Sequence, residues 1–68
     1  MNEEAFNLSV RKLLKSFGVS AQREIEQAVA KAHARGSVAE TETLPAKVTL
    51  QIAGLNLNWE FKGEIELR

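Results

Sequence analysis

The chain has 68 residues, with nine Lys or Arg against nine Asp or Glu, a single histidine and no cysteine. Because these charges balance, no net field concentrates phosphate polymers or anionic lipid around the chain, which argues against a general nucleic-acid binder. We expect one domain, residues 1–68, whose core gives only about 3 to 5 kcal/mol of net stability; with neither a disulfide nor a zinc site to add to it, oligomerisation is the remaining common means of stabilisation.

The first residues of the chain, Met1-Asn2-Glu3-Glu4, are acidic where a secretory signal is basic. No apolar run approaches the roughly 20 residues that span a bilayer. The absence of cysteine fits a reducing compartment. We therefore expect a soluble, cytoplasmic protein that does not associate with membranes.

The first predicted element is an amphipathic helix over about residues 3–17. Asn2 is a favourable N-cap residue, and Gly18 suits the left-handed position that follows a helix. Leu8 falls on the far side of this helix and has no evident use within the chain. The apolar residues that recur at helical spacing on the near side are Phe6, Val10, Leu13, Leu14 and Phe17.

A second helix is predicted over about residues 21–35, with Ser20 as its N-cap and Gly36 as its stop. The turn Gly18-Val19-Ser20 is short, so the two helices are expected to lie side by side as a helical hairpin. The second apolar stripe is mostly alanine and would let another backbone approach closely. It consists of Ala21, Ile25, Ala28, Val29 and Ala32.

The polar segment Ser37–Glu42 predicts a connecting loop, which can be ordered or mobile. Pro45 follows it and has no backbone N–H to donate. It is therefore expected at the beginning of a strand or on a strand's free edge.

From residue 46 onward the hydrophobic pattern changes to alternation at every second residue. This pattern predicts an antiparallel β-hairpin with strands over about 46–53 and 55–67 and a turn at Ala53-Gly54-Leu55. With Gly54 at either central position of a tight turn, even-numbered residues of the first strand face odd-numbered residues of the second. The two possible registers differ by two residues, and both place all the apolar side chains on one face.

A two-stranded hairpin is marginal in water, so the two helices are expected to pack on its apolar face, which gives an α+β fold. Both edges of the hairpin stay unpaired in this arrangement. Charged side chains at Lys62, Glu64 and Glu66 disfavour pairing of the second strand's free edge with another strand. Lys47 alone protects the edge of the first strand less. A homodimer that joins edges, or that buries Leu8 and the alanine stripe, is the hypothesis that follows.

The segment Leu14–Val29 has the outline of a DNA-binding helix-turn-helix. That motif has an apolar residue six positions after the turn glycine, but this position is Glu24 and the apolar residue comes one later, at Ile25. A shift of one residue turns the packing face by about 100°. An ordinary helical hairpin is therefore favoured over a DNA-binding one.

His33 is the only imidazole, and a lone histidine in a chain with neither cysteine nor aspartate cannot form a catalytic triad or a metal cage within one subunit. A cation near a helix C-terminus is the preferred interpretation. A metal held by two His33 side chains across a dimer axis is the alternative.

Three carboxylates, Glu60, Glu64 and Glu66, share one face of the second strand and are interpreted as a solvated face instead of an acid–base pair. Trp59 and Phe61, with Lys62 nearby, could stack on single-stranded RNA, but they share the apolar face and are interpreted as core. We predict no catalytic, cofactor-binding or metal-binding residues, and no enzymatic activity.

Several segments together resemble a family of small bacterial proteins of about this length that is known only as a domain of unknown function. The resemblance covers nearly the whole chain and implies no activity, cofactor or site residue. The segments that carry it are Asn2–Asn7, Ser9–Lys12, Gly18–Glu26, Glu42–Pro45, Val48–Leu50 and Gly63–Leu67.

The sequence therefore favours a small non-enzymatic protein-interaction module that acts as a homodimer or binds another protein. The alternative is a nucleic-acid-binding accessory protein that uses the helical hairpin. A small-molecule or metal sensor acting through His33 is a weaker third hypothesis.

Overall fold

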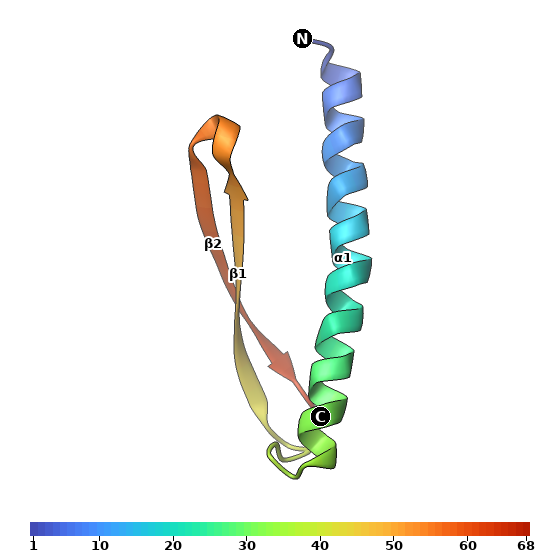
Figure 1. Ribbon diagram of the computed structural model, residues 1–68, viewed down its shortest axis with the longest axis vertical. Helices are drawn as coiled ribbons and strands as arrows, with labels where there is room; N and C mark the ends of the chain where they lie inside the picture. The colour runs from blue at the N-terminus through green and yellow to red at the C-terminus, as the bar shows by residue number, and fades with distance from the viewer. The chain divides into compact units, whose positions relative to one another are not determined.

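A computed structural model describes residues 1–68 and contains one long helix and one antiparallel hairpin (Figure 1). The predicted α+β class is therefore confirmed. The chain divides into a helical unit, Met1–Ser37, and a hairpin unit, Val38–Arg68. The elements are α1 at Glu3–Ala34, β1 at Thr43–Ile52, a short 3-10 turn, η1, at Ala53–Leu55, and β2 at Leu57–Glu66.

The helical unit holds a single helix of 32 residues, so the prediction of two helices, about 3–17 and 21–35, is wrong. The expected turn at Gly18-Val19-Ser20 lies inside α1, where Ser20 is an interior residue and not an N-cap. Gly18 does not have a positive φ. The helical hairpin, and with it the outline of a helix-turn-helix, is absent.

α1 is continuous because keeping Gly18, Val19 and Ser20 in a helix costs less free energy than ending one helix and starting another. Glycine inside a helix costs about 1 kcal/mol relative to alanine, and valine and serine cost about half as much each. A break would cost more, because two new helix ends would leave backbone N–H and C=O groups without intrahelical partners. The spacing also favours continuity: Ala21 follows Phe17 by four residues, so the second apolar stripe continues the first.

Both ends of α1 carry the caps that the sequence predicts. The side chain of Asn2 accepts a hydrogen bond of 3.1 Å from a backbone N–H in the first turn. At the other end, the N–H of Gly36 donates to the His33 carbonyl at 3.0 Å, and the N–H of Ser37 donates to the Ala32 carbonyl at 2.9 Å. These two bonds form a Schellman motif, in which Gly36 takes the left-handed conformation with φ of 70°.

In the hairpin unit, even-numbered residues of β1 face odd-numbered residues of β2, as predicted. Of the two registers that the sequence allows, the structure has the one in which Ile52 faces Leu57. Since side chains alternate between the two faces of a strand, all the apolar pairs lie on one face. These pairs are Leu44 with Ile65, Ala46 with Gly63, Val48 with Phe61, Leu50 with Trp59, and Ile52 with Leu57.

The hairpin turn differs from the predicted one. Four residues connect the strands, because η1 is followed by Asn56 in the left-handed region at φ 51° and ψ 33°. The Asn56 N–H donates to the Ala53 carbonyl at 3.1 Å. Asparagine tolerates this conformation, so the special backbone position falls on Asn56 while Gly54 keeps an ordinary φ. The strands consequently end and begin at Ile52 and Leu57 in place of the predicted 53 and 55.

Pro45 lies inside β1, opposite Glu64. The Leu67 N–H donates to the Glu42 carbonyl at 3.1 Å, which makes these two residues a hydrogen-bonded pair, and the type of pair alternates from there along the hairpin. Pro45 therefore belongs to a pair whose backbone groups face outward. Its missing N–H falls on the free outer edge of β1, one of the two positions expected from sequence.

The predicted loop over 37–42 is irregular and ends in a turn that Glu42 closes. The Glu42 N–H donates to the Ala39 carbonyl at 3.1 Å, and the Ala39 N–H donates in return to the Glu42 carboxylate at 2.9 Å. Together with the bond from Leu67, these contacts join the turn to the base of the hairpin.

Neither unit buries a side chain by itself. The helix and the hairpin each present an apolar face on which every side chain keeps part of its surface exposed, and the exposed fraction exceeds one half at Phe6, Leu14 and Phe61, among others. An isolated helix and an isolated two-stranded hairpin are both marginal in water. The surfaces that need a partner are therefore the most informative part of this molecule.

Candidate interaction surfaces

The first surface is the apolar face of α1, here called the main stripe. Its residues repeat at intervals of eleven, as in Phe6, Phe17 and Ala28. An interval of eleven corresponds to about 3.67 residues per turn, so the stripe stays close to one side of a straight helix. The main stripe consists of Phe6, Val10, Leu13, Leu14, Phe17, Ala21, Ile25, Ala28, Val29 and Ala32.

A second, narrower apolar row lies on the opposite side of α1 and was missed from sequence. Leu8, Val19 and Ala30 are also eleven residues apart, and Leu8 and Val19 are 51% and 59% exposed. The predicted turn at Gly18-Val19-Ser20 places Val19 outside the helix, so that Leu8 has no apolar neighbour on its side of the helix. Continuity of α1 restores the row, and the eleven-residue interval was the signal available in the sequence.

The apolar face of the hairpin centres on two aromatic side chains. The rings of Trp59 and Phe61 are tilted by 49° with centroids 5.7 Å apart. The two side chains are 52% and 54% exposed, so no core forms around them within the hairpin unit. A tilted aromatic pair of this kind is a common centre of a protein interface.

The polar face of the hairpin carries charges of both signs. Lys47 Nζ lies 3.2 Å from Glu60 Oε2, and both side chains are more than half exposed. Lys62 faces Lys47 directly across the strands, an arrangement that is unfavourable within one hairpin. Along β2 the charges of this face run Glu60, Lys62, Glu64, Glu66, so the three predicted carboxylates do share a face but are interrupted by a lysine.

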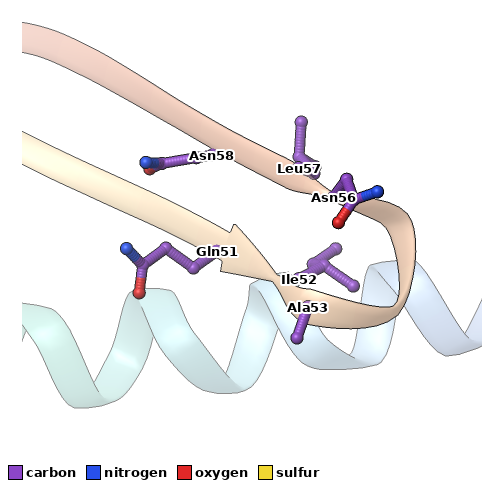
Figure 2. A pocket seen from close by; sticks show the side chains of 6 residues that line it. All are labelled: Gln51, Ile52, Ala53, Asn56, Leu57 and Asn58. Atoms are coloured by element: carbon purple, nitrogen blue, oxygen red, sulfur yellow. The ribbon is translucent and has the colours of Figure 1, made fainter.

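The hairpin carries an open depression of about 400 Å³ at its tip. Figure 2 shows the amide side chains of Gln51 and Asn58 extending away from the turn and that of Asn56 lying at the turn itself. The remaining lining residues are Ile52, Ala53 and Leu57. None of the six ionises, so this surface offers amide hydrogen bonds and apolar contact.

His33 lies in the last turn of α1, the position in the chain's helical segment that the sequence predicts. The structure brings no group of three His, Cys, Asp or Glu side chains together in the way that a metal site requires. No helix is long and apolar enough to cross a bilayer.

Comparison with known proteins identifies a family but not a function. The model of a family of unknown function, DUF6494, matches residues 1–68, and the chain belongs to this family. No curated protein matches the chain, and no solved structure does.

Proposed function

We propose that this member of the DUF6494 family is a non-enzymatic protein-interaction module that acts as a homodimer. The observation that carries the proposal is the absence of any buried side chain in either unit taken alone. Because the family is one of unknown function, the proposal is based on the surfaces of the chain itself.

The apolar surfaces are larger than a stable monomeric unit would leave uncovered. The main stripe runs along α1, and the hairpin presents five apolar pairs on one face. Full burial of a large aliphatic or aromatic side chain contributes about 1.5 to 3 kcal/mol, and contiguous exposed patches of this kind mark interaction sites. Several such side chains must become buried before a chain of this length is stable.

A second copy is the partner that best fits these surfaces, because it is present wherever the chain is. A two-fold axis brings one surface patch against the same patch of the partner, so each favourable contact in that patch occurs twice. Lys62, which opposes Lys47 within one hairpin, can find an opposite charge only outside its own pair. A heterologous protein partner would have to supply this complementarity separately.

The native mass tests this proposal. We expect sedimentation equilibrium or light scattering after gel filtration to give the mass of two chains at micromolar concentrations, with a reversible shift toward one chain on dilution. A mass of one chain at every concentration up to the solubility limit would contradict the homodimer and direct the search to a different protein partner.

The alternative function, nucleic-acid binding by a helical hairpin, loses the element on which it was based, because α1 is continuous. Nucleic-acid binding by another surface would give an affinity that falls steeply with salt. Titration of labelled single-stranded RNA and duplex DNA at about 50 and 200 mM salt separates the two hypotheses, since an interaction module of the kind proposed gives no saturable binding at either concentration.

A further inference from the structure

The outer edge of β2 is the better of the two free edges for pairing with another strand. Glu42 and Leu67 form a hydrogen-bonded pair, and hydrogen-bonded pairs alternate with non-hydrogen-bonded pairs along the hairpin. The β2 residues whose N–H groups point away from β1 are therefore Asn58, Glu60, Lys62, Glu64 and Glu66. Every one of these residues has a donor. The corresponding edge of β1 is interrupted by Pro45, which has none.

We propose that two copies of the chain pair antiparallel along the outer edges of β2, with the two-fold axis at Phe61, to form a continuous four-stranded sheet. This inference rests on the proposed homodimer and specifies its contact surface. The axis at Phe61 lets residues 57–65 of each strand overlap, nearly the full length of β2 at Leu57–Glu66. It also keeps the apolar faces of both hairpins on the same side of the joint sheet.

Charge complementarity selects this register. With the axis at Phe61, Glu60 of each copy faces Lys62 of the other, so that two opposite-charge pairs form. The one other carboxylate within the overlap, Glu64, faces the neutral Asn58. Lys62 thereby gains the opposite charge that its partner within the hairpin, Lys47, does not provide.

The neighbouring registers are disfavoured by the same rule. An axis at Lys62 places the two Lys62 side chains opposite each other and sets Glu60 against Glu64. An axis at Gly63 pairs Lys62 with Glu64 but sets Glu60 against Glu66. In a parallel arrangement each charged residue lies beside the same residue of the other copy, so that like charges meet. The charges along this edge therefore favour the axis at Phe61 over these alternatives.

Gly63 gives a second, independent reason for the axis at Phe61. Its φ is not positive, and a Cβ atom built on it would meet only the Phe61 ring, at an ordinary 3.7 Å. Neither backbone conformation nor crowding within the hairpin requires glycine at this position, although glycine weakens a strand. In the proposed register Gly63 faces Trp59 of the other copy, and the missing side chain of Gly63 lets the indole ring lie against its backbone.

Charge reversal at Lys62 tests the contact. Lys62→Glu leaves the hairpin intact, because the new carboxylate faces Lys47 in the same chain. Across the axis it faces Glu60 of the other copy, twice per dimer. We expect the dissociation constant, measured by sedimentation equilibrium, to rise about tenfold, since each cross-strand charge pair changes sign.

The matched control is Lys12→Glu on α1, which alters the net charge by the same amount but belongs to the helical unit, whereas Glu60 and Lys62 belong to the hairpin unit. Its dissociation constant is expected to stay within about twofold of the wild type, because the cost of general repulsion is small at physiological salt. A second change on the Lys62→Glu background then identifies the register. Glu64→Lys restores affinity for an axis at Gly63 but not for an axis at Phe61, where residue 64 faces the neutral Asn58, whereas Glu60→Lys restores affinity in both registers.

A cysteine cross-link gives a readout that does not depend on charge, and the native chain has no cysteine to interfere. The two copies of residue 61 lie on the axis in a non-hydrogen-bonded pair, with Cα atoms about 4.5 Å apart and within reach of a disulfide. Phe61→Cys is expected to form a covalent dimer under mild oxidation. Lys62→Cys, whose copies lie about 7 to 8 Å apart on the diagonal, is expected to cross-link far more slowly.

The outcomes separate this inference from the proposed function. A wild-type chain that is monomeric throughout overturns both. A dimer whose affinity is the same in Lys62→Glu and Lys12→Glu, or whose affinity is restored when Glu64→Lys is added to Lys62→Glu, overturns the pairing at Phe61 and leaves the homodimer in place. Loss of affinity with Lys62→Glu, rescue by Glu60→Lys and rapid cross-linking at residue 61 support the proposed sheet.

Discussion

Two glycines of the helical unit differ in backbone conformation, and their alanine variants are expected to change the free energy of unfolding in opposite directions. Gly18 lies inside α1 with an ordinary φ, and no atom lies within 4 Å of an added Cβ. Gly18→Ala should therefore raise the free energy of unfolding by about 1 kcal/mol, the difference in helix propensity. Gly36 has φ of 70°, so Gly36→Ala should lower it by about 1 to 2 kcal/mol.

Urea unfolding followed by circular dichroism at the helical band measures both changes. The Gly18 variant distinguishes the observed helix from the helical hairpin expected from sequence, because a left-handed residue in a turn at this position would make alanine destabilising. A loss of stability in Gly18→Ala would contradict a continuous α1.

The Glu42 side chain is expected to stabilise the base of the hairpin through the hydrogen bond that it accepts from the Ala39 N–H at 2.9 Å. Glu42→Ala should lower the free energy of unfolding by about 0.5 to 1.5 kcal/mol, the usual contribution of one such bond. Glu42→Gln keeps an acceptor oxygen and should lose less. Thr41→Ala, in the same turn, is the control and should change little, as followed by the fluorescence of Trp59 during unfolding.

The elements show which kinds of sequence signal can be trusted here. The caps at Asn2 and Gly36 were predicted correctly, because each is decided by one side chain or one backbone conformation. The parity of the hairpin followed from alternation, which has only two outcomes for each strand. These features depend on local chemistry and were therefore readable without the structure.

The helix break at Gly18-Val19-Ser20 could not be decided from residue types alone. These three residues are typical of a turn, but their summed cost is about 2 kcal/mol, less than the cost of two further helix ends. The spacing from Phe17 to Ala21, and the interval of eleven that joins Leu8 to Val19, do indicate continuity. Periodicity across a suspected break is thus more informative than the propensities at the break.

At the hairpin turn, the residue in the left-handed backbone conformation is Asn56 and not Gly54. Gly54→Ala should consequently be neutral or slightly stabilising, since the φ is ordinary and no atom lies within 4 Å of an added Cβ. Asn56→Ala should lower the free energy of unfolding by about 1 kcal/mol, because alanine is less tolerant of the left-handed region. A two-residue turn centred on Gly54 would reverse this order in the same unfolding assay.

At the scale of the whole molecule, the candidate surfaces could be predicted only in part. The apolar face of the hairpin and most of the main stripe were identified from spacing, as was the presence of unpaired edges. The choice between the edges could not be made, because it depends on which residues have outward N–H groups. That assignment comes from the bond between Leu67 and Glu42 and from the resulting position of Pro45.

If burial of these surfaces requires a second copy, unfolding and dissociation are coupled, and stability must depend on protein concentration. The entropy of unfolding for two chains of this length is about 0.3 kcal/mol/K, so each tenfold rise in concentration should raise Tm by about 5 °C. Differential scanning calorimetry between about 10 and 1000 μM measures this shift. Lys62→Glu should lower the whole line of Tm against concentration without changing its slope, since the variant weakens association but leaves the number of chains in the folded state at two. A Tm that does not move with concentration would mean that one chain covers its apolar faces unaided, and the stabilising contacts would then have to be sought within the monomer.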